Sequence, residues 1–110
     1  MLYGESGDDI LYGKDGDDKL IGGGGDDYII GGYGNDTITI YPGGNDTIIG
    51  GDNAEIEYTD YLSLWGRESD YTIIETSTGM EITNKDDNSK LIVSGIEEIT
   101  YFEPSEWGGW

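Results

Sequence analysis

Apolar residues recur at a fixed interval through the first half of the chain. They occupy the eighth position of a nine-residue unit that starts at Gly4, and one inserted residue, Ile40, precedes the last of them. These residues are Leu11, Leu20, Ile29, Ile38 and Ile48. Because neighbouring side chains of a strand point to opposite faces, each predicts a three-residue strand with its middle side chain inward. Such short strands bury little alone, so the pattern predicts stacked turns around one thin core.

The six residues before each short strand are rich in glycine and acidic residues. The first position holds Gly4, Gly13, Gly22 and Gly31, and the fourth holds Gly7, Gly16, Gly25, Gly34 and Gly44. The sixth position holds Asp9, Asp18, Asp27, Asp36 and Asp46. Glycine recurs where the chain needs positive φ or a close backbone approach. The pattern therefore predicts tight turns with inward carbonyls and a ladder of aspartates.

A ladder of closely spaced carboxylates predicts a bound cation. Like charges at this density repel one another strongly unless a cation lies between them. Carboxylate and carbonyl oxygens form a hard ligand set, which favours Ca²⁺ over softer metals. The candidate ligands are the turn glycines and aspartates named above, together with Glu55 in a degenerate sixth unit.

The amino-acid composition limits the kinds of partner that the chain can bind. The 110 residues carry 24 Asp+Glu against 5 Lys+Arg, a formal net charge of −19. This charge argues against nucleic acid and anionic membranes as partners, since both attract basic surfaces. The chain has no Cys and no His, which excludes disulfides, zinc sites of thiolate or imidazole, and Ser-His-Asp triads. No apolar run is long enough to span a bilayer.

The unit GGYGNDTIT and its neighbours resemble the nonapeptide of the repeats-in-toxin (RTX) family. The resemblance implies an all-β fold, a parallel β-roll whose successive turns alternate sides, with Ca²⁺ between turns n and n+2. It implies three sites, Asp9 with Asp27, Asp27 with Asp46, and Asp18 with Asp36. A weaker fourth would join Asp36 to the turn of Glu55, for three to four ions in total. It also implies a secreted, extracellular or cell-surface bacterial protein exported by the type I route.

The nine-residue period stops after residue 55, which divides the chain into a roll (1–55) and a capping segment (56–110). Short strands are expected at 56–64, 71–76, 80–84, 91–93 and 99–102, with a hairpin turn at 77–79. The segment from Gly66 to Phe102 resembles those that often follow RTX rolls. Its expected role is to cover the open end of the roll. At the other end the repeat register runs off the N-terminus, so we expect the chain to belong to a longer array.

These observations favour a calcium-binding module of a larger secreted protein, one that folds on Ca²⁺ after export. The rest of the parent polypeptide is then a partner alongside the ions. The alternative is a carbohydrate-binding accessory module, because tryptophan and tyrosine are concentrated in the second half. We expect no enzymatic activity, since the repeat already accounts for the paired carboxylates as calcium ligands.

One outward face of the roll is expected to be apolar. If alternate strands form alternate sheets, the side chains that point outward from one sheet are those of Ile10, Tyr12, Tyr28, Ile30, Thr47 and Ile49. Those that point outward from the opposite sheet form a more polar set: Lys19, Ile21, Thr37 and Thr39. So many apolar side chains on one exposed face favour docking of the cap, of the rest of the parent protein or of a second copy on that face.

Overall fold

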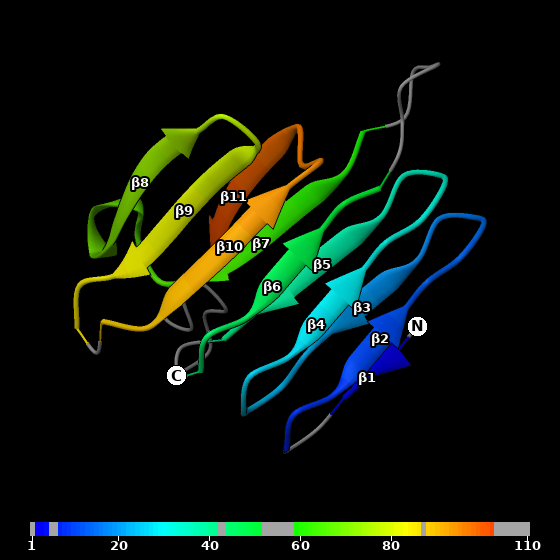
Figure 1. The fold of residues 1–110 in the computed structure, drawn as a ribbon, viewed down its shortest axis with the longest axis horizontal. Helices are drawn as coiled ribbons and strands as arrows, with labels where there is room; N and C mark the ends of the chain where they lie inside the picture. Colours follow the sequence, from blue (N-terminus) through cyan, green and yellow to red (C-terminus); the bar gives the residue numbers. More distant parts are fainter. Residues whose placement is uncertain (1, 5–6, 42–43, 52–58, 87, 103–110) are drawn as a thin grey trace, which may run out of the picture.

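The computed structural model describes residues 2–4, 7–41, 44–51, 59–86 and 88–102, and it is built from two sheets (Figure 1). In spatial order the first sheet contains β1 (Leu2–Tyr3), β3 (Lys19–Ile21), β5 (Thr37–Ile40), β7 (Tyr61–Trp65) and β11 (Glu98–Phe102). The second contains β2 (Ile10–Tyr12), β4 (Tyr28–Ile30), β6 (Thr47–Ile49), β10 (Lys90–Ser94), β9 (Gly79–Asn84) and β8 (Tyr71–Thr76). A short 3-10 helix, η1 (Glu68–Asp70), precedes β8.

The repeat strands alternate between the two sheets, as predicted for a β-roll. Each strand pairs in parallel with the strand two units along, so that Leu11 lies beside Ile29 and Ile29 beside Ile48. In the first sheet Leu20 lies beside Ile38 in the same way. The prediction of an all-β parallel roll is therefore confirmed for the repeat region.

The core between the sheets is the column of Leu and Ile residues seen in the sequence. Leu20, Ile29, Ile38 and Ile48 have no exposed surface, and Leu11 is buried near the N-terminal end of the roll. The column continues beyond the repeats with further buried side chains: Leu62, Leu64, Ile82, Leu91 and Val93. One inward residue per short strand is enough to form a continuous core, because the neighbouring turn covers each of these residues.

The strands of the second half extend the same two sheets. β7 pairs in parallel with β5, β11 with β7, and β10 with β6. β9 and β8 then add antiparallel strands, joined by a turn at Ser77 and Thr78 as expected for a hairpin. The expected boundary near residue 55 and the start of the strand expected at 56–64 lie outside the described residues, and β7 begins at Tyr61.

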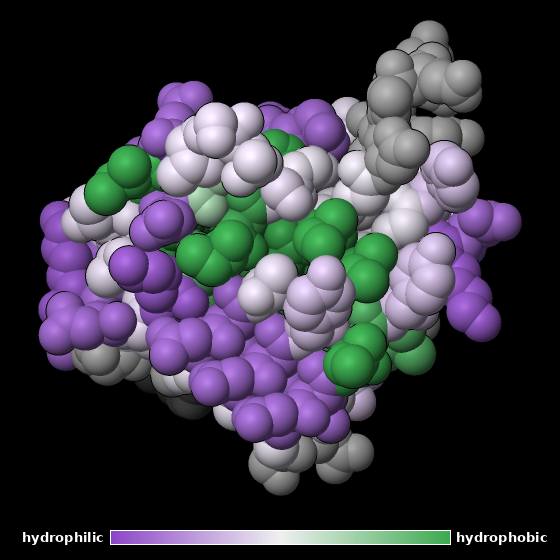
Figure 2. All heavy atoms as spheres, in the orientation of Figure 1, coloured by the Kyte–Doolittle hydropathy of each residue, from purple (hydrophilic) through white to green (hydrophobic). Residues whose placement is uncertain are grey.

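The outward face of the second sheet carries apolar side chains. Ile10 is 78% exposed, Tyr12 and Tyr28 are also exposed, and Ile30 and Ile49 are half-buried. Ile92 on β10 continues this surface. Figure 2 shows apolar residues across the middle of this face, with hydrophilic residues below them. A hollow of about 260 Å³ is lined by Tyr12, Ile30, Gly32, Tyr33, Ile49 and Gly51.

Within the described part of the chain, no helix is long and apolar enough to cross a membrane.

We expect Ile29→Ala to lower the free energy of unfolding by about 2–5 kcal/mol, because it opens a cavity in the middle of the core column. Ile10→Ala, at an exposed position of the adjacent strand, should change it by less than about 0.5 kcal/mol. Urea unfolding of both variants in saturating calcium measures the difference. Equal losses in the two variants would contradict a core formed by this column.

Candidate calcium sites

The turns of the roll fall alternately on two edges. The turns that end in Asp9, Asp27 and Asp46 lead into the second sheet, and we call their side the first edge. The turns that end in Asp18 and Asp36 lead into the first sheet, on the second edge. Each repeat aspartate therefore has its neighbour in the ladder two units away in sequence.

Backbone amides and carboxylates link the aspartates along each edge. On the first edge the Asp9 amide donates to Oδ1 of Asp27 at 2.9 Å, and the Asp27 amide donates to Oδ1 of Asp46 at 2.7 Å. On the second edge the Asp18 amide donates to Oδ1 of Asp36 at 2.9 Å. The structure thus brings together the three pairs expected from the sequence, with one oxygen of each acceptor carboxylate used.

The other carboxylate oxygen is left without a partner in the ladder. Oδ2 is buried and accepts no hydrogen bond in Asp9, Asp18, Asp27 and Asp36. Asp27 is 3% exposed and Asp36 has no exposed surface. A buried carboxylate oxygen without a donor is costly. Two such oxygens lie on each edge, and bound cations would satisfy them.

Backbone carbonyls converge on the same spaces as these oxygens. A Cβ atom added to Gly13 would lie 2.8 Å from Oδ2 of Asp18 and 2.6 Å from the carbonyl oxygen of Gly31, two units along. At Gly4 the corresponding distances are 2.8 Å to Asp9 and 2.7 Å to Gly22. Gly4 and Gly13, at the first position of the unit, therefore leave room beside a carboxylate oxygen and a carbonyl oxygen.

The glycine at the fourth position has a different role. Gly34 has φ of +107°, a conformation that is costly for residues with a side chain. A Cβ atom there would lie 2.3 Å from the carbonyl oxygen of Gly16, the equivalent residue two units earlier. The fourth position thus needs glycine both for its backbone angles and for the close stacking of turns.

The pKa values of the buried aspartates are raised, as expected for carboxylates that lack a counter-charge. Burial, together with the neighbouring carboxylates of Asp60 and Asp18, raises the pKa of Asp36 to about 7. Burial and the carboxylate of Asp27 raise the pKa of Asp46 to about 6. The pKa of Asp27 is raised for the same reasons. Without a cation, folding therefore favours the protonated forms of the Asp27, Asp36 and Asp46 carboxyl groups.

The arrangement requires ligands other than side chains. Among the residues that the structure describes, no three acidic side chains converge on one point. A site here must combine the carboxylates of two turns with backbone carbonyls. Ca²⁺ accepts such mixed oxygen sets in flexible geometry, so the residues present fit calcium.

An outer ladder of hydrogen bonds was missed in the sequence. The fifth position of the unit holds Asp or Asn, and its side chain accepts the amide of the equivalent residue two units later. The amide of Asp26 donates to Asp8 at 2.8 Å, and the amide of Asn35 donates to Asp17 at 2.9 Å. These exposed contacts brace adjacent turns. The recurring Asp or Asn before each repeat aspartate was the available signal.

The second edge continues past the repeats to an aspartate that the sequence did not predict. Glu55, the weak candidate of the sixth unit, lies outside the described residues. The next aspartate in the ladder is Asp60, whose Oδ1 accepts the Asp36 amide at 2.9 Å. Asp60 was not predicted, although Asp60-Tyr61-Leu62 repeats the order of Asp36-Thr37-Ile38.

The family model described as RTX calcium-binding nonapeptide repeat (4 copies) matches residues 2–38 and 43–56. The first half of this chain consists of RTX calcium-binding repeats. Comparisons with curated proteins and with solved structures gave no match. RTX repeats bind Ca²⁺, so the chain is a calcium-binding module with Asp-rich turns. The RTX match ends before Asp60 and before the strands that close the roll.

We expect Gly13→Ala to raise the calcium concentration at the folding midpoint by about tenfold, or about 1.4 kcal/mol, because its methyl group would enter the space between Asp18 and the Gly31 carbonyl. Gly24→Ala is the matched control, since a Cβ atom at this exposed turn position meets nothing within 4 Å. Calcium titration followed by circular dichroism compares the two. Equal midpoints would show that this space is not used by the ion.

Acidification should partly replace calcium. Because Asp36 and Asp46 have folded-state pKa values of about 7 and about 6 against an ordinary value of 3.8, the calcium-free fold binds protons more tightly than the unfolded chain. Its stability should therefore fall as the pH rises from about 4 to about 7. Circular dichroism of metal-depleted protein should show more β structure at pH 5.5 than at pH 8. An unchanged spectrum would contradict this reasoning.

Proposed function

We propose that this chain is a calcium-dependent folding module of a larger secreted bacterial protein. The observation that carries the proposal is the set of four buried, unpartnered Oδ2 atoms, two on each edge. Those of Asp9, Asp18 and Asp36 lie beside the same glycine as a backbone carbonyl oxygen from the turn two units along. When no cation is bound, the free-energy cost of burying these oxygens without hydrogen-bond partners opposes folding. A divalent ion between two turns removes this cost. Binding and folding are therefore one event.

Three ions are expected between repeat turns. Two lie on the first edge, between Asp9 and Asp27 and between Asp27 and Asp46. The third lies on the second edge, between Asp18 and Asp36. Each pair already shares an amide-to-carboxylate hydrogen bond, which fixes the spacing of the turns.

Energetic estimates support a switch driven by the calcium concentration. Extracellular calcium sites typically have Kd of about 10⁻⁴–10⁻³ M. An ion at about ten times Kd stabilises the folded state by roughly 1.4 kcal/mol, so three ions contribute about 4 kcal/mol. This approaches the low end of the stability of a small domain, about 5 kcal/mol. At sub-micromolar cytosolic calcium the contribution disappears, and the net charge of −19 opposes compaction.

This dependence suits a protein that is exported before it folds. RTX repeats are typical of secreted bacterial proteins, and we propose that this chain is secreted by the type I route as part of its parent. An acidic chain would stay expanded in the cytosol and fold where calcium is millimolar. The activity of the parent lies elsewhere in that protein.

We assign no catalytic role to the module, because its buried carboxylates are committed to the calcium ladders. A carbohydrate-binding role receives less support from the described aromatic residues. Tyr41, Trp65 and Phe102 cluster with ring centroids 5.4–5.8 Å apart, and Phe102 meets the other two edge to face. Such contacts use the rings to pack against one another. Docking through the apolar face of the second sheet stays a prediction.

The test is circular dichroism of the chain in chelator, in millimolar Ca²⁺ and in millimolar Mg²⁺, at equal ionic strength. We expect β structure and a cooperative thermal transition only with Ca²⁺. Mg²⁺ should substitute poorly, because it requires stricter octahedral geometry and loses its water reluctantly. A chelated sample with the full β signal and a sharp transition would overturn the proposed function.

A further inference from the structure

The aspartate ladder of the second edge continues past the repeats. Asp60 lies 24 residues after Asp36, whereas Asp36 lies 18 after Asp18, yet all three occupy the same register. The pairing of β5 with β7 sets this register, since Ile38 lies beside Leu62. Asp60 is completely buried, as Asp36 is. A residue outside the repeat match therefore takes the place of a repeat aspartate.

The space beside Gly31 has the features of the spaces between repeat turns. A Cβ atom on Gly31 would lie 2.7 Å from Oδ2 of Asp36 and 2.3 Å from the carbonyl oxygen of Gly50. Oδ2 of Asp36 is one of the four buried carboxylate oxygens without a hydrogen-bond partner, and the whole residue has no exposed surface. The same pair of oxygens, from Asp18 and Gly31, flanks Gly13.

The geometry points to a fourth calcium site formed by Asp36, the Gly50 carbonyl and Asp60. One half of this site is a repeat turn, and the other half includes the residue that immediately precedes β7. The inference rests on the proposed function, because it assumes that the repeat turns hold calcium. It assigns the last ligand to Asp60 in place of Glu55.

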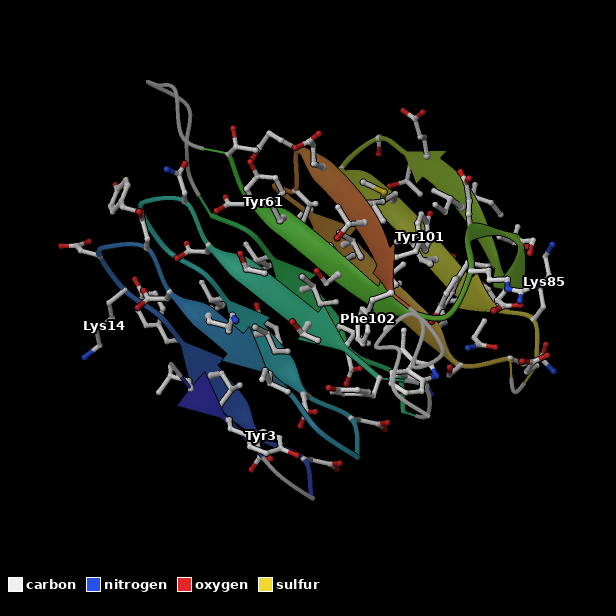
Figure 3. The ribbon with its side chains drawn as sticks, turned by 180° about the vertical axis from the view of Figure 1, so that it is seen from behind. Tyr3, Lys14, Tyr61, Lys85, Tyr101 and Phe102 are labelled. Atoms are coloured by element: carbon white, nitrogen blue, oxygen red, sulfur yellow. The ribbon has the colours of Figure 1, made fainter. Side chains whose placement is uncertain are left out.

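The capping strands hold Asp60 in place. Its amide donates to Oε1 of Glu97 at 2.7 Å, and its carbonyl oxygen accepts the amides of Glu97 and Glu98 at 3.1 and 3.2 Å. Glu97 precedes β11, which pairs with β7 along its whole length. Figure 3 shows Tyr61, next to Asp60, and Lys14, in an earlier turn, along the second edge. Glu97 is a positioning residue, and the ion at Asp60 joins the cap to the roll.

The decisive variant is Asp60→Asn, which keeps a side-chain oxygen for the Asp36 amide and removes the charge. Equilibrium dialysis with radioactive calcium should give four ions for the wild-type chain and three for Asp60→Asn. Glu55→Gln is the matched control and should still bind four. Hydrogen exchange at 61–65 and 98–102 should accelerate at least about tenfold in Asp60→Asn and stay unchanged in Asp9→Asn, which removes a ligand at the far end of the roll.

Several results would overturn the site. Four ions bound by Asp60→Asn would exclude Asp60 as the ligand. Three ions bound by Glu55→Gln would contradict the assignment of the last ligand to Asp60 in place of Glu55. If Asp60→Asn fails to fold, Asp36→Asn gives a second measurement. Asp36 is shared by two sites in our assignment, so this variant should lose two ions, and a loss of one would contradict the site. A wild-type chain that binds no calcium would instead reject the proposed function itself.

Discussion

The burial of a column of aspartates between stacked turns is the constraint on which the structure depends. Asp27 and Asp36 each accept, through Oδ1, the amide of the aspartate two units earlier, and the Oδ2 atom of each is buried without a hydrogen-bond partner. The raised pKa values of Asp36 and Asp46 are the electrostatic consequence. The fold therefore brings carboxylates together at an electrostatic cost. In our proposal, a divalent ion bound between them replaces this repulsion with attraction.

The thin core explains why such ions matter. Each repeat strand contributes one inward Leu or Ile, so the hydrophobic contribution per turn is small even though Leu20 and Ile38 are completely buried. Turns of glycine and aspartate add little apolar contact of their own. We therefore propose that each bound ion supplies stability that a larger domain obtains from its core.

The two edges of the roll end in different chemistry. On the first edge the Asp46 carbonyl accepts the amide of Ile92, which places the buried Leu91 in the next position of the ladder. On the second edge the Asp60 carbonyl accepts the amide of Glu98, which places Glu97 in the next position of that ladder. The Asp60 amide donates to the carboxylate of Glu97. The capping strands thus close one ladder with an apolar side chain and the other with a carboxylate. The fourth calcium site that we propose therefore lies on the second edge.

The sequence by itself determined the roll, its inward column and its repeat aspartates, because a nine-residue period repeats the same local geometry at Asp18 and Asp36. It also predicted the hairpin at Ser77 and Thr78 from turn chemistry. It could not assign Asp60, because 24 residues separate it from Asp36 and no fixed period spans the interval. Only the pairing of β7 with β5 decided that register, since strand pairing depends on contacts between segments far apart in the chain.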